Sequence, residues 1–218
     1  MTGEVFGQGP PQWWTEFMPN SASNGEAWYT WHKPRGCAFV FMFLIGGGGG
    51  GSGGTSSGGT GAATGGGGGA SGAVLRAVFP AVVVPDVLYV SVGYGGRGGA
   101  AGADGNLGAH TYVSASPVVT ANQLYGIARA STATAATRTA AQGVSTVTAA
   151  ADALHLNLGV WLSVAGQAGG NGGSAAAGTS VSPGSGVCNT GGAGGGGATA
   201  SADRAGGQIS AGYGPLIT

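Results

Sequence analysis

The chain has 218 residues, of which 51 are glycine and only 6% are charged, and its formal net charge is zero. Phosphate binding needs clustered cations, so this composition argues against a nucleic-acid-binding protein. Hydrophobic residues make up 42% of the chain and include five tryptophans, which favours an ordered core over disorder.

Residues 1–36 form a glycine-poor head that we separate from a glycine-rich body, residues 37–218. The head holds four of the five tryptophans, Trp13, Trp14, Trp28 and Trp31. Aromatic side chains are enriched in the cores of protein interfaces. Two interpretations stay open: an irregular segment packed on its own aromatic rings, and an arm that docks on a partner through these tryptophans.

Hydrophobic segments in the body predict β-strands. Residues 38–45 are apolar throughout, which predicts a strand buried on both faces. Eight residues are far fewer than the roughly 20 that span a bilayer as a helix, so we expect no membrane insertion. Residues 74–92 predict one or two strands broken at Pro80 and Pro85, and residues 111–115 a further short strand. Residues 154–164 alternate with a period of two, which predicts one buried face.

Glycine tracts follow the strands that end near residues 45, 92 and 164. From Gly93 to His110 the sequence consists of six triplets, each with glycine first. The polyproline-II backbone turns once every three residues, so glycine on one edge lets neighbouring helices approach closely. We therefore predict a mainly β fold in which strands alternate with packed, polyglycine-II-like tracts, with little α-helix. A flexible linker is the alternative for residues 46–72.

The sequence offers little for catalysis. A GxGxxG match at residues 93–98 is expected by chance in so glycine-rich a chain, and no helix or suitably placed acid follows it. His32, His110 and His155 lie in different segments, so no zinc site is indicated. We expect no enzyme, no cofactor and no metal. Cys37 and Cys188 form either one disulfide or, in our preferred interpretation, two separate thiols.

Bulky or polar residues interrupt the glycine tracts. They are Tyr94, Arg97, Asp104, Asn106, His110 and Tyr213. Such side chains do not all fit into tight helix packing, so they face either solvent or a neighbouring protomer. The functional alternative is that they contact a ligand, since aromatic rings and amides suit sugars or an outer-membrane surface.

Two stretches resemble the glycine-rich domain of tailed-bacteriophage tail fibre and minor tail proteins. The first is Trp31-His-Lys33-Pro34-Arg-Gly36, followed by a strand and a glycine run. The second, residues 85–99 (PDVLYVSVGYGGRGG), matches a P-G turn, a V-x-V-G strand and a GxGGxGG tract, although Asp86 stands where glycine is usual. More distantly, the chain resembles phage adhesins that stack polyglycine-II helices.

This resemblance implies a virion structural protein, assembled in the host cytoplasm as a homo-oligomer and expected to be a trimer. It would be a fibre, spike or tail-tip component, held to other virion proteins by the tryptophan-rich arm. The loops would bind a host surface glycan or an outer-membrane protein. A capsid decoration protein that binds only virion subunits is the second interpretation. A polyglycine-II ice-binding protein is a third, which the tryptophan-rich head fits poorly.

Overall fold

We describe the protein from a computed structural model. The structure describes residues 2–4, 13–19, 28–55, 63–120, 123–131, 151–152, 160–182, 198–199 and 202–203. Over these residues the fold is mainly β with almost no helix; a short 3-10 turn, η1 (Ala81–Val83), follows β5. Within the same part of the chain, no helix has the length and apolarity to cross a membrane.

Two antiparallel sheets carry most of the strands. The first has the order β10-β5-β4 and is built from β4 (Phe39–Ile45), β5 (Val74–Pro80) and β10 (Val160–Val164). The second has the order β3-β6-β7-β8-β9, with β3 (Trp28–His32), β6 (Val87–Ser91), β7 (Thr111–Ser114), β8 (Leu124–Ala128) and β9 (Ala151–Asp152). Two short pairs join β1 (Thr2–Glu4) to β2 (Trp13–Thr15) and β11 (Ala198–Thr199) to β12 (Ala202–Asp203).

The hydrophobic core lies between the two main sheets. The first sheet contributes alternate residues of β4 and β5, among them the fully buried Leu75 and Phe79. The second contributes Leu88 and Val90 from β6 together with residues of β7 and β8. Burying each large apolar side chain stabilises the fold by roughly 2 kcal/mol, so this core holds the sheets face to face.

Most of the expected strands are confirmed. Residues 74–92 form two strands, β5 and β6, separated at the prolines by η1, and residues 111–114 form β7. Of the alternating segment 154–164, the structure describes residues 160–164, which form β10.

The prediction that residues 38–45 are buried on both faces is wrong. The burial of β4 alternates: Val40, Met42 and Leu44 face the core. The other face is 50–67% exposed and consists of Phe39, Phe41, Phe43 and Ile45. The reason is that the five-stranded sheet covers only one side of β4.

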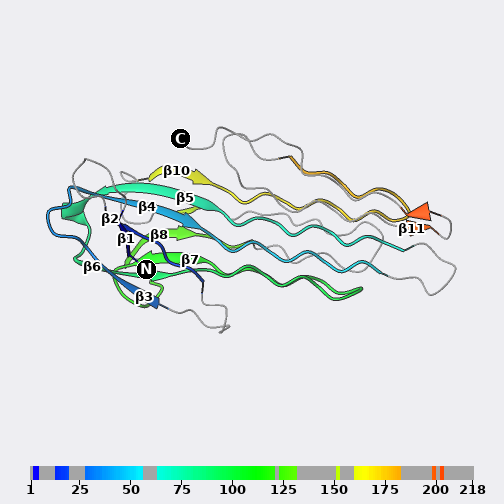
Figure 1. The fold of residues 1–218 in the computed structure, drawn as a ribbon, viewed down its shortest axis with the longest axis horizontal. Coiled ribbons are helices and arrows are strands. Elements are labelled where there is room, and N and C mark those ends of the chain that lie inside the picture. Colours follow the sequence, from blue (N-terminus) through cyan, green and yellow to red (C-terminus); the bar gives the residue numbers. More distant parts are fainter. Residues whose placement is uncertain are drawn as a thin grey trace.

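Glycine tracts extend from the strands toward the opposite end of the molecule, where they run alongside one another (Figure 1). The central tract, residues 46–55, continues β4, and the β5 tract, residues 64–73, leads into β5. The edge hairpin, residues 93–110, joins β6 to β7, and the β10 tract, residues 165–174, follows β10. We call these four segments together the glycine array.

Candidate functional site

The central tract of the glycine array forms hydrogen bonds that recur every three residues. One set of its N–H groups donates to the β5 tract over 2.8–3.0 Å, in the pairs Gly46 to Ala73, Gly49 to Ala70, Ser52 to Gly67 and Thr55 to Thr64. A second set donates to the edge hairpin, in the pairs Gly47 to Ala109, Gly50 to Asn106 and Gly53 to Ala103. The carbonyls of Gly48, Gly51 and Gly54 accept from Gly96, Gly99 and Gly102. The three residues of each triplet therefore bond in turn to the β5 tract, to the returning half of the edge hairpin and to its outgoing half.

The same spacing continues on either side of the central tract. The N–H groups of Gly65, Gly68 and Ser71 donate to the β10 tract, at Gly173, Gly170 and Gln167. Within the edge hairpin, Asn106 and Ala109 donate to the carbonyls of Arg97 and Tyr94. In a β-sheet, hydrogen bonding toward one neighbour alternates with a period of two residues. The array is therefore a hydrogen-bonded bundle of segments with a different repeat from the sheets that it joins.

Close backbone contact explains why glycine recurs in the edge hairpin. A Cβ added to Gly93, Gly96 or Gly99 would lie less than 3.0 Å from backbone atoms of the returning half of the hairpin. At Gly105 and Gly108 it would meet the central tract equally closely. The nearest atom to a Cβ at Gly95 or Gly98 would be 3.9 or 3.7 Å away, which is ordinary contact. Five of the six glycines that open the triplets are therefore in tight backbone contact, and the sixth, Gly102, instead has a positive φ of 69° at the tip of the hairpin.

The edge hairpin brings together five of the six residues predicted to contact the host surface. Arg97, Asp104 and Asn106 are exposed, whereas Tyr94 and His110 are half-buried. Arg97 and Asn106 lie opposite each other, because the Asn106 N–H donates to the Arg97 carbonyl over 2.8 Å. The sixth residue, Tyr213, lies outside the described residues.

His110 has a packing role that sequence reasoning missed. Its Nδ1 accepts a hydrogen bond from the Ala130 N–H over 2.7 Å, and its ring packs edge-on against Tyr112 at a centroid distance of 5.7 Å. These contacts tie the base of the edge hairpin to the segment that follows β8. Because Ala130 is 20 residues away in sequence, no local pattern pointed to this contact.

The predicted docking tryptophans lie on two separate elements. Trp28 and Trp31 are half-buried in β3, where Trp28 stacks on Tyr112 at 6.3 Å and Trp31 packs against the core. Trp14 in β2 is 60% exposed, and for Trp13 the structure describes only its place in β2. Their docking role stays a prediction, and the exposure of Trp14 makes it the accessible member of the described set.

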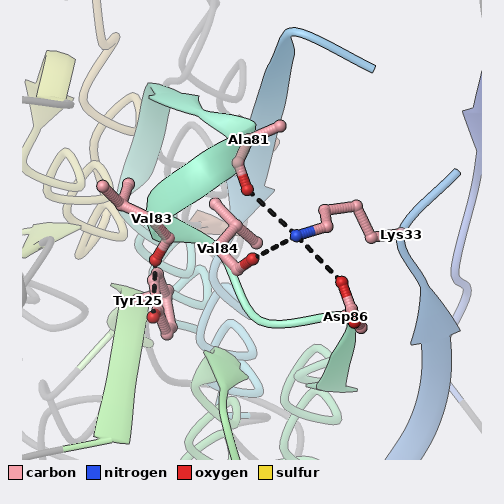
Figure 2. Close-up of polar contacts among 6 residues, drawn as sticks. All are labelled: Lys33, Ala81, Val83, Val84, Asp86 and Tyr125. Atoms are coloured by element: carbon pink, nitrogen blue, oxygen red, sulfur yellow. Dashed lines mark hydrogen bonds and ion pairs between the residues drawn. The ribbon is translucent and has the colours of Figure 1, made fainter. Parts of the chain in front are cut away.

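Lys33 binds the segment that connects β5 of the first sheet to β6 of the second (Figure 2). Its Nζ lies 3.0 Å from the Ala81 carbonyl, 2.7 Å from the Val84 carbonyl and 3.0 Å from an Asp86 carboxylate oxygen. An ammonium group has three N–H donors, so these three acceptors satisfy it. In the sequence Lys33 stands out only as part of a motif, because its carbonyl acceptors lie about 50 residues further along the chain.

Tyr125 lies beside this lysine contact. Its hydroxyl donates to the Val83 carbonyl over 3.0 Å, and its ring packs edge-on against Phe79 (Figure 2). Burial raises the pKa of Tyr125, while the positive charge of Lys33 acts in the opposite direction. Together, Lys33 and Tyr125 bind three carbonyls of the segment that links β5 to β6.

The described residues hold no group of three His, Cys, Asp or Glu side chains that could bind a metal. Cys37 is a free, half-buried thiol. This favours two separate thiols over one disulfide; Cys188, the other cysteine, lies outside the described residues.

The fold and the array define a β-rich protein whose strands extend into a hydrogen-bonded, glycine-rich array. A family model described as a glycine-rich domain matches residues 22–215. The chain therefore belongs to this glycine-rich domain family. A search of curated proteins finds no match to the chain.

Proposed function

We propose that this chain is a structural protein of a bacteriophage virion, a fibre, spike or tail-tip component that holds contact residues against a host surface. The observation that carries the proposal is the three-residue repeat of hydrogen bonds in the glycine array. In this proposal the tracts are packed polyglycine-II helices, which have three residues per turn. Such packing gives a stiff body without a catalytic centre, cofactor or metal.

The edge hairpin would present its side chains at regular spacing. Tyr94 and Arg97 are three residues apart, which corresponds to about 9 Å along a polyglycine-II helix. Arg97, Asp104 and Asn106 are exposed and supply a cation, an anion and an amide, a set that suits a host surface glycan or an outer-membrane protein. Weak single contacts would gain avidity if several copies assemble, and a trimer is the expected oligomer.

The head, residues 1–36, would attach the glycine-rich body, residues 37–218, to other virion proteins. Support comes from the exposed ring of Trp14. We expect Trp13→Ala/Trp14→Ala to abolish incorporation into particles, measured by immunoblotting of purified particles. Circular dichroism checks that the double variant stays folded; Trp14 itself is 60% exposed and lies outside the core clusters. Normal incorporation of the variant would exclude the docking arm.

A capsid decoration protein is the alternative, and the exposed apolar face of β4 favours it, since such a protein contacts only neighbouring subunits. Immunogold electron microscopy of intact particles from the source distinguishes the two. Label on tails or projecting fibres supports the adhesin proposal. Label spread over the capsid supports decoration, and absence of label with an antibody that recognises the purified native chain would overturn a virion role.

A further inference from the structure

Two connections at one end of the molecule expose paired valines. They join β5 to β6 and β7 to β8, whereas the glycine array continues the opposite ends of β5, β6 and β7 (Figure 1). In the first connection, Val82 is 89% and Val83 40% exposed; in the second, Val118 is 57% and Val119 40% exposed. Connections normally present polar side chains to water, and these two present apolar ones.

Polar groups around both connections hold the backbone instead of facing water. Lys33 and Tyr125 together bind three carbonyls of the β5–β6 connection (Figure 2). Beside the second connection, the buried Ser114 hydroxyl donates to the Gln123 carbonyl over 3.1 Å. The valines therefore stand on backbone that is already ordered, so little conformational entropy is lost when they bind a partner.

We propose that these four valines, Val82, Val83, Val118 and Val119, form an end surface that docks on another virion protein. Tyr125, the second residue of β8, donates to the Val83 carbonyl over 3.0 Å and so holds the two connections beside each other. The inference rests on the proposed function, in which the array faces the host and the opposite end faces the particle. The end surface then adds to the contact made by the head.

Orientation favours a different protein over a second copy of the chain as the partner. Two copies joined through their end surfaces would point their glycine arrays in opposite directions, so only one array would face a host. Attachment of the end surface to the particle leaves every array free and is compatible with three copies side by side. Among the exposed large hydrophobic side chains of the described residues, Leu107 alone belongs to the array. Exposed apolar surface marks sites of interaction, which places docking at the sheets.

The surroundings of the end surface define the chemistry of its partner. Asp86, in the same connection as η1, is already paired with Lys33 at 3.0 Å. The third connection at this end, residues 33–38 between β3 and β4, adds the exposed cation Arg35. A fitting partner therefore has an apolar surface with an acidic side chain at its edge, since complementary charge gives specificity.

The test measures incorporation of variants by immunoblotting of purified particles. Val82→Asp/Val118→Asp places two charges on the end surface and should lower incorporation at least about tenfold, because an unpaired charge in an apolar interface is costly. The control Leu107→Asp/Ala101→Asp adds two charges at exposed positions of the edge hairpin and should incorporate like the wild type. Circular dichroism checks that both fold. Should the first not fold, Val82→Ser/Val118→Ser replaces it and should also lower incorporation.

Normal incorporation of a folded end-surface variant would overturn the inference and leave the proposed function standing. An equal loss in the control would overturn it as well. Absence of the wild-type chain from particles would instead overturn the proposed function and, with it, this inference. Sedimentation velocity of the purified chain tests the other occupant: association that Val82→Asp/Val118→Asp abolishes would show that a second copy covers the end surface, against the partner proposed.

Discussion

Gly96 and Gly98 provide a matched test of the glycine array, because they are only two residues apart but differ in the room available for a side chain. A Cβ at Gly96 would lie less than 3.0 Å from the Asn106 carbonyl and from the N of Gly50. These atoms belong to backbone that is itself hydrogen-bonded within the array. At Gly98 the nearest atom is the Gly51 oxygen at 3.7 Å, and neither glycine has a positive φ.

We expect Gly96→Ala to lower the free energy of unfolding by about 1–3 kcal/mol, the usual effect of forcing a methyl group into a packed interior. Gly98→Ala should be neutral or stabilise by up to about 1 kcal/mol, because alanine restricts the unfolded chain. For a protein of this length, each kcal/mol corresponds to about 2–4 °C in Tm. The two variants should therefore differ in Tm by several degrees.

Urea unfolding followed by tryptophan fluorescence, together with thermal unfolding by circular dichroism, measures the difference. Gly95→Ala serves as a second permitted position, since its nearest atom is 3.9 Å away. If all three variants unfold at the same urea concentration, the edge hairpin does not pack at backbone contact distance. If Gly98→Ala lowers the free energy of unfolding more than Gly96→Ala does, then Gly98 and not Gly96 lies in the tight backbone contact.

Three further predictions concern the lysine contact and the edge hairpin. Lys33→Met should lower the free energy of unfolding by about 2–4 kcal/mol, because two carbonyls lose a charged donor. Asp86→Asn should change it by less than about 1 kcal/mol, because Asp86 is 91% exposed. Urea unfolding compares the two variants, and equal losses would contradict the stabilising role of the two carbonyl contacts of Lys33. Since burial raises the pKa of Tyr125, the stabilisation from its neutral hydroxyl is complete below the unfolded pKa of about 10 and is lost as pH rises through the higher folded pKa. Lys33→Met should raise the pKa of Tyr125 further, measured by ultraviolet titration against a Tyr125→Phe control. A lowered pKa in Lys33→Met would refute this prediction. Under the host-binding proposal, Tyr94→Ala/Arg97→Ala/Asn106→Ala should reduce adsorption at least about tenfold with normal incorporation, while Leu107→Ala on the same hairpin should not; unchanged adsorption would exclude these residues as the contact site.

The period of the glycines was predictable from sequence because contact between backbones excludes side chains at fixed intervals. Gly93, Gly96 and Gly99 could be separated from Gly95 and Gly98 by their triplet register alone. The neighbours of each tract could not be predicted, because they depend on how distant strands pair. The central tract bonds to residues 64–73 and to the edge hairpin at once, and nothing local in residues 46–55 specifies either partner.

Burial was predicted less well than periodicity. The sequence of β4 is apolar at every position, and sequence alone does not distinguish a face covered by the same chain from one left exposed. Lys33 and His110 show a similar limit. Each side chain contacts backbone atoms contributed by a distant segment, so the residues were visible in the sequence but their partners were not.

The sheets determine the register of the glycine array, because pairing continues without a break from strand to tract. Ile45 pairs with Val74 in the first sheet, and the next residue, Gly46, donates to Ala73 in the array. The edge hairpin likewise preserves the pairing of β6 with β7, and the β10 tract that of β10 with β5. Glycine has no side chain to bury and loses much entropy on ordering, so glycine-rich tracts have little burial of their own to fix their alignment. Hydrophobic burial between the sheets therefore aligns the tracts. That alignment decides which glycines lie opposite each other, and so which residues form the three-residue repeat of hydrogen bonds.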